Sequence, residues 1–122
     1  MSRISTHVLD VVLGKPAAGI PVQLDRMKGR IEWSQEGGRV EEADWAKVAT
    51  AVTDKDGRCS DLMSDAAFGV YRLTFNTTLY LQPLGRGRLY PEISITFQCD
   101  GNSHFHLPLL LSDNSYTTYR GS

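Results

Sequence analysis

Length, composition and charge exclude several classes of protein. The chain has 122 residues, of which 41% are hydrophobic and 22% are charged, values typical of one globular domain over residues 1–122. Acidic and basic side chains are mixed and give a formal net charge of -1, so no nucleic-acid-binding surface is indicated. Residues 1–5 contain no apolar run typical of a signal peptide, and no segment is long and apolar enough to span a membrane. We therefore expect a cytoplasmic protein that works away from membranes.

Short strand-like segments alternate with clusters of Gly, Pro, Asn and Asp, which favour turns. The expected strands are residues 5–13, 20–24, 45–52, 70–80, 92–99 and 103–111. The polar segment 28–44 is expected to be an exposed loop. Ser64 or Asp65 is expected to cap a short helix that ends at Gly69. Many short strands with one minor helix indicate an all-β, antiparallel sandwich.

All three histidines are predicted to lie on outer faces of this sandwich. Alternation along the last strand puts four apolar residues on the core face: Phe105, Leu107, Leu109 and Leu111. The opposite face then carries His104, His106, Pro108 and Leu110. In the first strand, Ile4, Thr6 and Val8 share one face, and His7 lies on the other with Ser5 and Leu9. These mixed outer faces leave two interpretations open, a surface covered by another subunit or scattered surface residues of a monomer.

The histidine spacing is compatible with a metal site. His104 and His106 project to the same side of a strand, and His7 would add a third nitrogen ligand, as in a catalytic zinc site. The spacing alone is weak support, because no cluster of cysteines or carboxylates accompanies it. Two cysteines, Cys59 and Cys99, are too few for a disulfide framework and are expected to be idle thiols.

Arg58 follows the Asp56-Gly57 turn and has two possible roles. An arginine in this position is usually a solvated loop residue. Its guanidinium group is also suited to hold an anionic ligand, because it offers paired donors in one plane. The chain has no Gly-x-Ser-x-Gly motif, so a serine nucleophile of the α/β-hydrolase type is not indicated.

Four motifs in the same order give the chain a family resemblance. They are STHVLD at residues 5–10, DGR at 56–58, HLPLLLS at 106–112 and YRGS at 119–122. In these motifs the chain resembles the transthyretin-related 5-hydroxyisourate hydrolases over nearly its whole length. The terminal YRGS is the most specific piece, because it separates these enzymes from transthyretin, the hormone carrier with the same fold.

The resemblance implies a fold and an assembly. The fold is a transthyretin-like (prealbumin-like) β-sandwich of two four-stranded sheets with one short helix. Four copies form a homotetramer in which outer sheet faces line a central channel, with the active sites at its mouths. Such an assembly would cover the mixed outer faces described above. No metal or organic cofactor is implied.

The resemblance also implies a reaction and the residues that carry it. Water opens a ring of 5-hydroxyisourate at an acyl carbon and yields 2-oxo-4-hydroxy-4-carboxy-5-ureidoimidazoline. The implied catalytic residues are His7, Arg58, His106 and Ser122, and the implied substrate-binding residues are His7, Arg58 and Tyr119. We assign water activation to the two histidines with help from Ser122, and stabilisation of the developing negative oxygen to Arg58. Tyr119 is expected to shape the pocket, and His104 matches no catalytic position.

One departure from the family pattern concerns the loop that leads to the tail. Asp113 stands where the family normally has proline, which would fix φ and remove a donor, so the loop over residues 112–115 is expected to differ in shape.

Two alternative functions remain for comparison. One is a transthyretin-like carrier of small molecules without catalysis, and the other is a zinc hydrolase that uses His7, His104 and His106.

Overall fold

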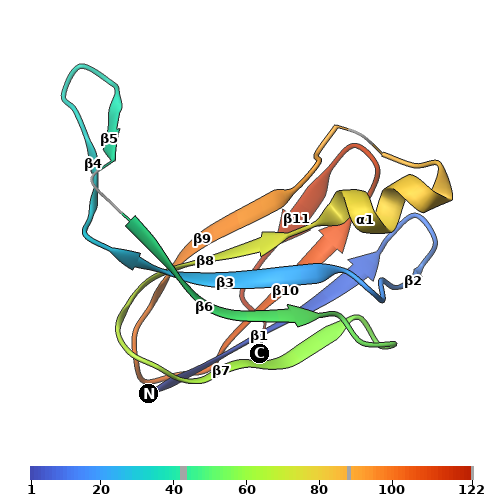
Figure 1. Ribbon diagram of the computed structural model, residues 1–122, viewed down its shortest axis with the longest axis horizontal. Helices are drawn as coiled ribbons and strands as arrows, with labels where there is room; N and C mark the ends of the chain where they lie inside the picture. The colour runs from blue at the N-terminus through green and yellow to red at the C-terminus, as the bar shows by residue number, and fades with distance from the viewer. Residues whose placement is uncertain (42–43, 88, 122) are drawn as a thin grey trace.

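Two β-sheets packed face to face form the body of the protein (Figure 1). The computed structural model describes residues 1–41, 44–87 and 89–121. In the first sheet, β11 (Tyr116–Thr118) pairs with β10 (Phe105–Leu111) and β10 with β1 (Ser2–Asp10). The other side of β1 pairs with the short β2 (Lys15–Pro16) and with β7 (Arg58–Ala66). The expected all-β sandwich of two sheets is thereby confirmed, but in the described residues this first sheet has five strands where four were expected.

The second sheet has the order β6-β3-β8-β9. Its strands are β6 (Asp44–Val52), β3 (Pro21–Lys28), β8 (Gly69–Phe75) and β9 (Ile93–Cys99). One short helix, α1 (Thr77–Leu81), and the 3-10 turn η1 (Gln82–Leu84) connect β8 to the segment that leads into β9. Neither helical element is long and apolar enough to cross a membrane.

The predicted alternation of inner and outer residues is confirmed in both central strands of the first sheet. Phe105, Leu107, Leu109 and Leu111 are at most 7% exposed and join the core. Ile4, Thr6 and Val8 of β1 are fully buried on the same side. Burial of each aliphatic side chain stabilises the fold by about 2 kcal/mol. The core therefore fixes which face of each strand is turned outward.

The pairing of β1 with β10 is parallel, which corrects the expectation of a purely antiparallel sandwich. The register runs from Ile4 opposite Phe105 to Asp10 opposite Leu111. Parallel neighbours need a long crossover connection, and here most of the chain lies between the two strands. Thr6 Oγ1 donates to the Leu107 carbonyl at 2.6 Å inside the core, so a buried hydrogen bond also holds this register.

The helix predicted after Ser64 or Asp65 is wrong, because that segment is the end of β7. Its buried residues are Cys59, Leu62 and Ala66, three and four positions apart, since the register against β1 shifts twice. Bulges of this kind replace strand alternation by a spacing that resembles a helix.

The helix instead begins at Thr77, inside the segment 70–80 that was expected to be a strand throughout. The Asn76 side chain caps it by accepting the Leu79 N–H at 3.2 Å. The Thr77 and Thr78 hydroxyl groups donate to the carbonyls of Tyr90 and Pro91 at 2.8 and 2.7 Å. Contacts with a distant segment therefore end the strand at Phe75.

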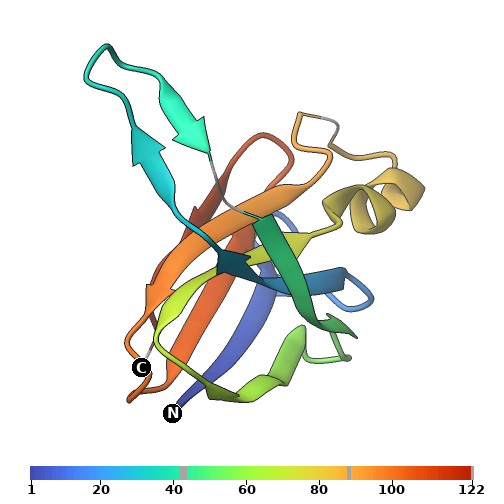
Figure 2. The same ribbon diagram turned by 60° about the vertical axis from the view of Figure 1, so that its left-hand side comes forward.

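Within the segment 28–44, which was expected to be an exposed loop, residues 31–41 form a hairpin, and residues 42 and 43 lie outside the described residues. Strands β4 (Ile31–Trp33) and β5 (Arg39–Glu41) pair with each other and project from the sandwich (Figures 1 and 2). Trp33 is 71% exposed on it.

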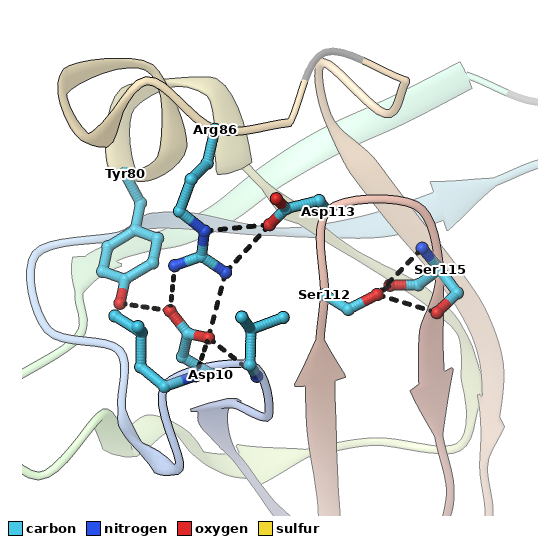
Figure 3. Close-up of polar contacts among 8 residues, drawn as sticks. Asp10, Tyr80, Arg86, Ser112, Asp113 and Ser115 are labelled. Atoms are coloured by element: carbon cyan, nitrogen blue, oxygen red, sulfur yellow. Dashed lines mark hydrogen bonds and ion pairs between the residues drawn. The ribbon is translucent and has the colours of Figure 1, made fainter.

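A buried ion pair fastens the end of β1 to the loops around it (Figure 3). Arg86 binds both carboxylate oxygens of Asp10, at 2.6 and 3.1 Å, and Tyr80 donates to the same carboxylate at 2.8 Å. Arg86 Nε also donates to Asp113 Oδ1 at 2.9 Å. Asp113, at the position where the resemblance implies a proline, thus anchors the loop before the tail by charge.

The cluster shifts the pKa of Asp10. Burial of the carboxyl group raises its pKa, but hydrogen bonds from Arg86, the Leu13 N–H and Tyr80 outweigh burial and lower it to about 2, below its ordinary value of 3.8. A carboxylate with a lowered pKa in the folded state stabilises the fold above its unfolded-state pKa. That contribution is lost as the pH falls from about 4 through about 2.

We predict that Arg86→Met lowers the free energy of unfolding at pH 7 by about 3 kcal/mol, because it leaves the buried Asp10 carboxylate without its cation. The difference from wild type should shrink as the pH falls from about 4 to about 2, where Asp10 takes up a proton. Urea unfolding followed by circular dichroism measures both effects.

The matched control is Arg30→Met, which breaks the exposed Arg30–Glu32 pair and should cost less than ~1 kcal/mol. Equal urea midpoints for the two variants at pH 7 would show that the buried cluster does not stabilise the fold.

Candidate active site

The parallel register of β1 and β10 brings two histidines onto one serine. Ser5 pairs with His106 across the strands, and its hydroxyl oxygen lies 2.8 Å from His106 Nδ1. The same oxygen lies 2.9 Å from His104 Nε2. Ser5 is buried, His106 is half-buried and His104 is exposed. These three outer-face residues form one hydrogen-bonded group.

The third histidine lies on β1, and the arginine comes from β7, the neighbour of β1 on the side away from β10. His7 pairs with Arg58 in the antiparallel register of β1 and β7. The ring of His7 is 6.5 Å from that of His106, centroid to centroid. The structure thus brings His7, Arg58 and His106, three of the predicted site residues, to one region of the first sheet's outer face.

The turn before β7 is built to place Arg58. The Asp54 carboxylate accepts the N–H groups of Asp56 and Arg58 at 2.9 Å each, and the Gly57 carbonyl accepts the Val8 N–H at 2.7 Å. Gly57 has φ +75°, and a Cβ at this position would be 2.3 Å from the Val8 carbonyl oxygen. Only glycine allows the turn to lie so close to β1. The DGR motif is therefore a device that fixes Arg58 opposite His7.

A pocket of about 220 Å³ opens beside this group. The described residues that line it are Arg3, Ser5, Thr6, Arg58, Ser60, His104 and His106. A larger hollow of about 740 Å³ lies over β3 and β6 of the second sheet, but its described lining contains no histidine, arginine or cysteine. The smaller pocket is lined by two histidines and Arg58, which can exchange protons and stabilise negative charge, so we identify it as the candidate active site.

The pocket favours a neutral His106. Burial lowers the pKa of the His106 imidazole below its ordinary value of 6.5, and the positive charges of His104, Arg58 and His7 lower it further. His106 is therefore unprotonated at neutral pH and is available as a base.

The C-terminal tail is docked on β10 of the same chain. Thr118 Oγ1 donates to the Pro108 carbonyl at 2.8 Å, and the Gly121 N–H donates to the His106 carbonyl at 2.7 Å. A Cβ on Gly121 would be 2.8 Å from Cδ2 of the His106 ring, so the glycine is what allows the tail to touch that ring.

Arg120 adds a second anchor for the tail. Its guanidinium donates to Ser103 Oγ at 2.9 Å and to the His104 carbonyl at 3.2 Å, and lies 4.1 Å from the centre of the Phe105 ring. Of the predicted tail residues, Tyr119 is 51% exposed, and Ser122 lies outside the described residues.

Metal ligation finds no geometric support in the described parts of the chain. Among residues 1–41, 44–87 and 89–121, no three His, Cys, Asp or Glu side chains are grouped to hold a metal ion. Cys59 and Cys99 are free and buried, and burial raises the pKa of the Cys59 thiol to about 11, which makes it a poor nucleophile.

Sequence reasoning missed the roles of Ser5, Gly121 and Arg120. Alternation had placed Ser5 on the face of His7, but its two imidazole partners lie about a hundred positions away in the chain. Gly121 and Arg120 belong to the YRGS motif, and only the docked tail shows what each of them contacts.

Comparisons with known proteins agree with the resemblance seen in the motifs. The profile of the HIUase/Transthyretin family matches residues 4–121. The 5-hydroxyisourate hydrolase of Mus musculus is 36% identical over 124 residues, which cover 99% of this chain and 96% of that protein. The uric acid degradation bifunctional protein TTL of Arabidopsis thaliana is 43% identical over 127 residues and 98% of this chain, which spans only 37% of that longer protein. The structure of Klebsiella pneumoniae 5-hydroxyisourate hydrolase superposes with a TM-score of 0.79, at 33% identity and with 100% of both chains covered.

Proposed function

This chain belongs to the HIUase/Transthyretin family, and on that basis we propose that it hydrolyses 5-hydroxyisourate to 2-oxo-4-hydroxy-4-carboxy-5-ureidoimidazoline in urate degradation. The observation that carries the proposal is the convergence of His7, Arg58 and His106 at the outer face of the first sheet. Residues 1–122 act as one transthyretin-like domain in the cytoplasm, without metal or organic cofactor.

The proposed mechanism gives each group one task. His106, held neutral by its surroundings, accepts a proton from water while the water oxygen bonds to the acyl carbon. Arg58 stabilises the negative oxygen that develops on that carbon. The ring C–N bond then breaks, and the proton taken from water goes to the departing nitrogen. His7 helps to position the water beside His106.

The tail completes the proposed site. Gly121 holds the chain end against His106, and its neighbour in the sequence, Ser122, supplies a hydroxyl that assists proton transfer. Tyr119 shapes the pocket and donates a hydrogen bond to the substrate.

The proposed active form is a homotetramer. Half-buried Leu9 and Leu110 lie on the same outer face as His7 and His106, and a second subunit would cover these apolar side chains. Closed symmetric assemblies are the usual form of such oligomers. Two subunits that meet on this face would enclose the small open pocket beside His106.

A direct assay tests the function. Freshly generated 5-hydroxyisourate should decay faster when the protein is added in catalytic amounts, as followed by ultraviolet absorbance. Chelators should leave the rate unchanged. Loss of activity on metal removal with recovery on adding zinc would favour the three-histidine zinc hydrolase. Saturable binding of small aromatic ligands without turnover would favour a carrier.

Alanine variants test the assignment of the histidines. His106→Ala and His7→Ala should each lower kcat/KM by ~100-fold or more, the usual effect of removing a general acid or base. His104→Ala should cost much less, although it lies beside His106. Comparable losses at His104 and His106 would mean that the wrong imidazole has been chosen as the base.

A single substitution and a truncation test whether the tail contributes to activity. Gly121→Ala should lower kcat/KM by ~10-fold, because the added Cβ displaces either the tail or the His106 ring. Truncation after Thr118 should remove most activity while the melting temperature and circular dichroism stay near wild type. The control is Gly38→Ala in the hairpin, where a Cβ meets only Ser34 Oγ, at 3.6 Å.

Sedimentation completes this test. Active full-length protein should sediment as a tetramer of ~54 kDa, built from the 13.6 kDa chain. Near-normal turnover by the truncated chain would show that the tail is not part of the active site. An active monomer would show that a second subunit is not needed.

A further inference from the structure

The Ser5 hydroxyl forms hydrogen bonds with two imidazoles at once. It lies 2.9 Å from His104 Nε2 and 2.8 Å from His106 Nδ1, distances typical of good hydrogen bonds. Ser5 is 4% exposed, so water does not readily compete for these bonds. The register of β1 against β10 holds the serine opposite His106, and the group does not depend on a loop.

Counting hydrogens leaves two arrangements of this group when both imidazoles are neutral. A hydroxyl has one hydrogen and two acceptor lone pairs, and among the described residues no group other than these two rings can take the Ser5 hydrogen, so Ser5 donates to one ring and accepts from the other. If it donates to His106 Nδ1, then His106 carries its own proton on Nε2 and has no free nitrogen to act as a base. If it donates to His104 Nε2, it accepts the Nδ1–H of His106, whose Nε2 is then bare. Only the second arrangement makes His106 a base.

The surroundings make a lasting positive charge on His106 unfavourable. The charged and titratable groups near it are His7 and Arg3 on β1, Arg58 and Asp61 on β7, and Arg120 on the tail. The Asp61 carboxylate pairs with Arg3 at 3.3 Å, and the Asp54 carboxylate, which interacts with Arg58 and His7, accepts the N–H groups of Asp56 and Arg58. His104, in contrast, is exposed, so water solvates a charge placed on it. A proton that His106 receives is therefore better held on His104.

We propose that Ser5 is a proton-relay residue that passes the proton received by His106 to His104 and back within each turnover. This inference rests on the proposed hydrolase function. As His106 Nε2 takes a proton from water, its Nδ1–H moves to Ser5 Oγ and the hydrogen of Ser5 moves to His104 Nε2. One proton has then crossed from His106 to His104, and the serine is again neutral. When Nε2–H goes to the departing ring nitrogen, the same two transfers run in reverse and restore the starting state.

The relay gives His104 and Ser5 positioning and proton-storage roles, in which neither residue exchanges a proton with the substrate directly. It also explains why one buried hydroxyl has two imidazole partners. A serine that only filled space or satisfied a backbone group would not need both. Among the described residues, Ser5 Oγ bonds no other group.

Four variants separate the relay from a structural role. Ser5→Ala removes the hydroxyl, and Ser5→Thr keeps it. His104→Gln keeps an oxygen that can accept from Ser5 but cannot hold the proton. Ser94→Ala, a serine on β9 that bonds Thr74, is the control on the opposite sheet. Melting temperatures establish that each variant folds.

Kinetics on 5-hydroxyisourate provide the first readout. Ser5→Ala and His104→Gln should each lower kcat by ~10-fold with KM nearly unchanged, less than the loss from removing the base itself. Ser5→Thr and Ser94→Ala should stay within about twofold of wild type. The dependence of kcat on the fraction of deuterium oxide should be curved for wild type, since several protons move together. It should become linear for Ser5→Ala and His104→Gln.

Nitrogen-15 NMR of the histidine rings provides a readout that needs no activity. Wild type and His104→Gln should show the Nδ1–H form of His106, and Ser5→Ala should shift the ring toward the Nε2–H form. Wild-type kcat and a curved deuterium dependence in Ser5→Ala, or an unchanged His106 form, would overturn the relay. No turnover by wild type would instead overturn the proposed function. The NMR result would still show whether the Ser5 hydroxyl determines which nitrogen of His106 carries the proton.

Discussion

The parallel pairing of β1 with β10 is the constraint on which the other features of the site depend. The inner residues of both strands are buried in the core, so a slip of one residue would turn them outward and bring histidines inside. The Thr6 hydroxyl bond to the Leu107 carbonyl lies within the same core and holds the register. Because the inner faces are fixed in this way, the outer faces are fixed as well. Ser5, His7 and His106 therefore take their relative positions from packing on the other side of the sheet.

The remaining parts of the site are attached to these two strands by glycines. Gly57 lets the turn before β7 approach the Val8 carbonyl, which sets Arg58 beside His7. Gly121 lets the tail lie against the His106 ring on β10. In both places an added Cβ would meet an atom at less than 3 Å. The site is thus built from four chain segments: β1 and β10 are held together by strand pairing, and the turn and the tail approach them because a side chain is absent at Gly57 and Gly121.

Charge is divided between the two ends of β1. At the end near Asp10, a carboxylate and the Arg86 guanidinium are buried together, and this pair holds three loops in place. Around His106, arginines and histidines outnumber the carboxylates, and the carboxylates of Asp61 and Asp54 already have partners. The first arrangement supports the fold. The second keeps an imidazole neutral and offers a cation for a negative oxygen. A transthyretin-like sandwich supplies the frame for both, and the residues on its outer face determine the chemistry.

The sequence alone determined the faces of the strands and the family. Alternation in residues 103–111 and in the first strand named the core residues and the outward histidines, because alternation depends only on backbone geometry within one segment. The motifs named His7, Arg58 and His106, which the structure brings together.

Tertiary structure decided what local patterns do not contain. The pairing partner of β1 lies about a hundred residues away, bulges gave β7 a helix-like spacing of buried residues, and distant carbonyls placed the helix after Phe75. The sequence marked Asp113 only as a departure from the expected proline, and the fold shows that Arg86 is its partner. In the same way, alternation identified Ser5 only as an outward residue of a strand. The parallel register shows that two imidazoles contact its hydroxyl group.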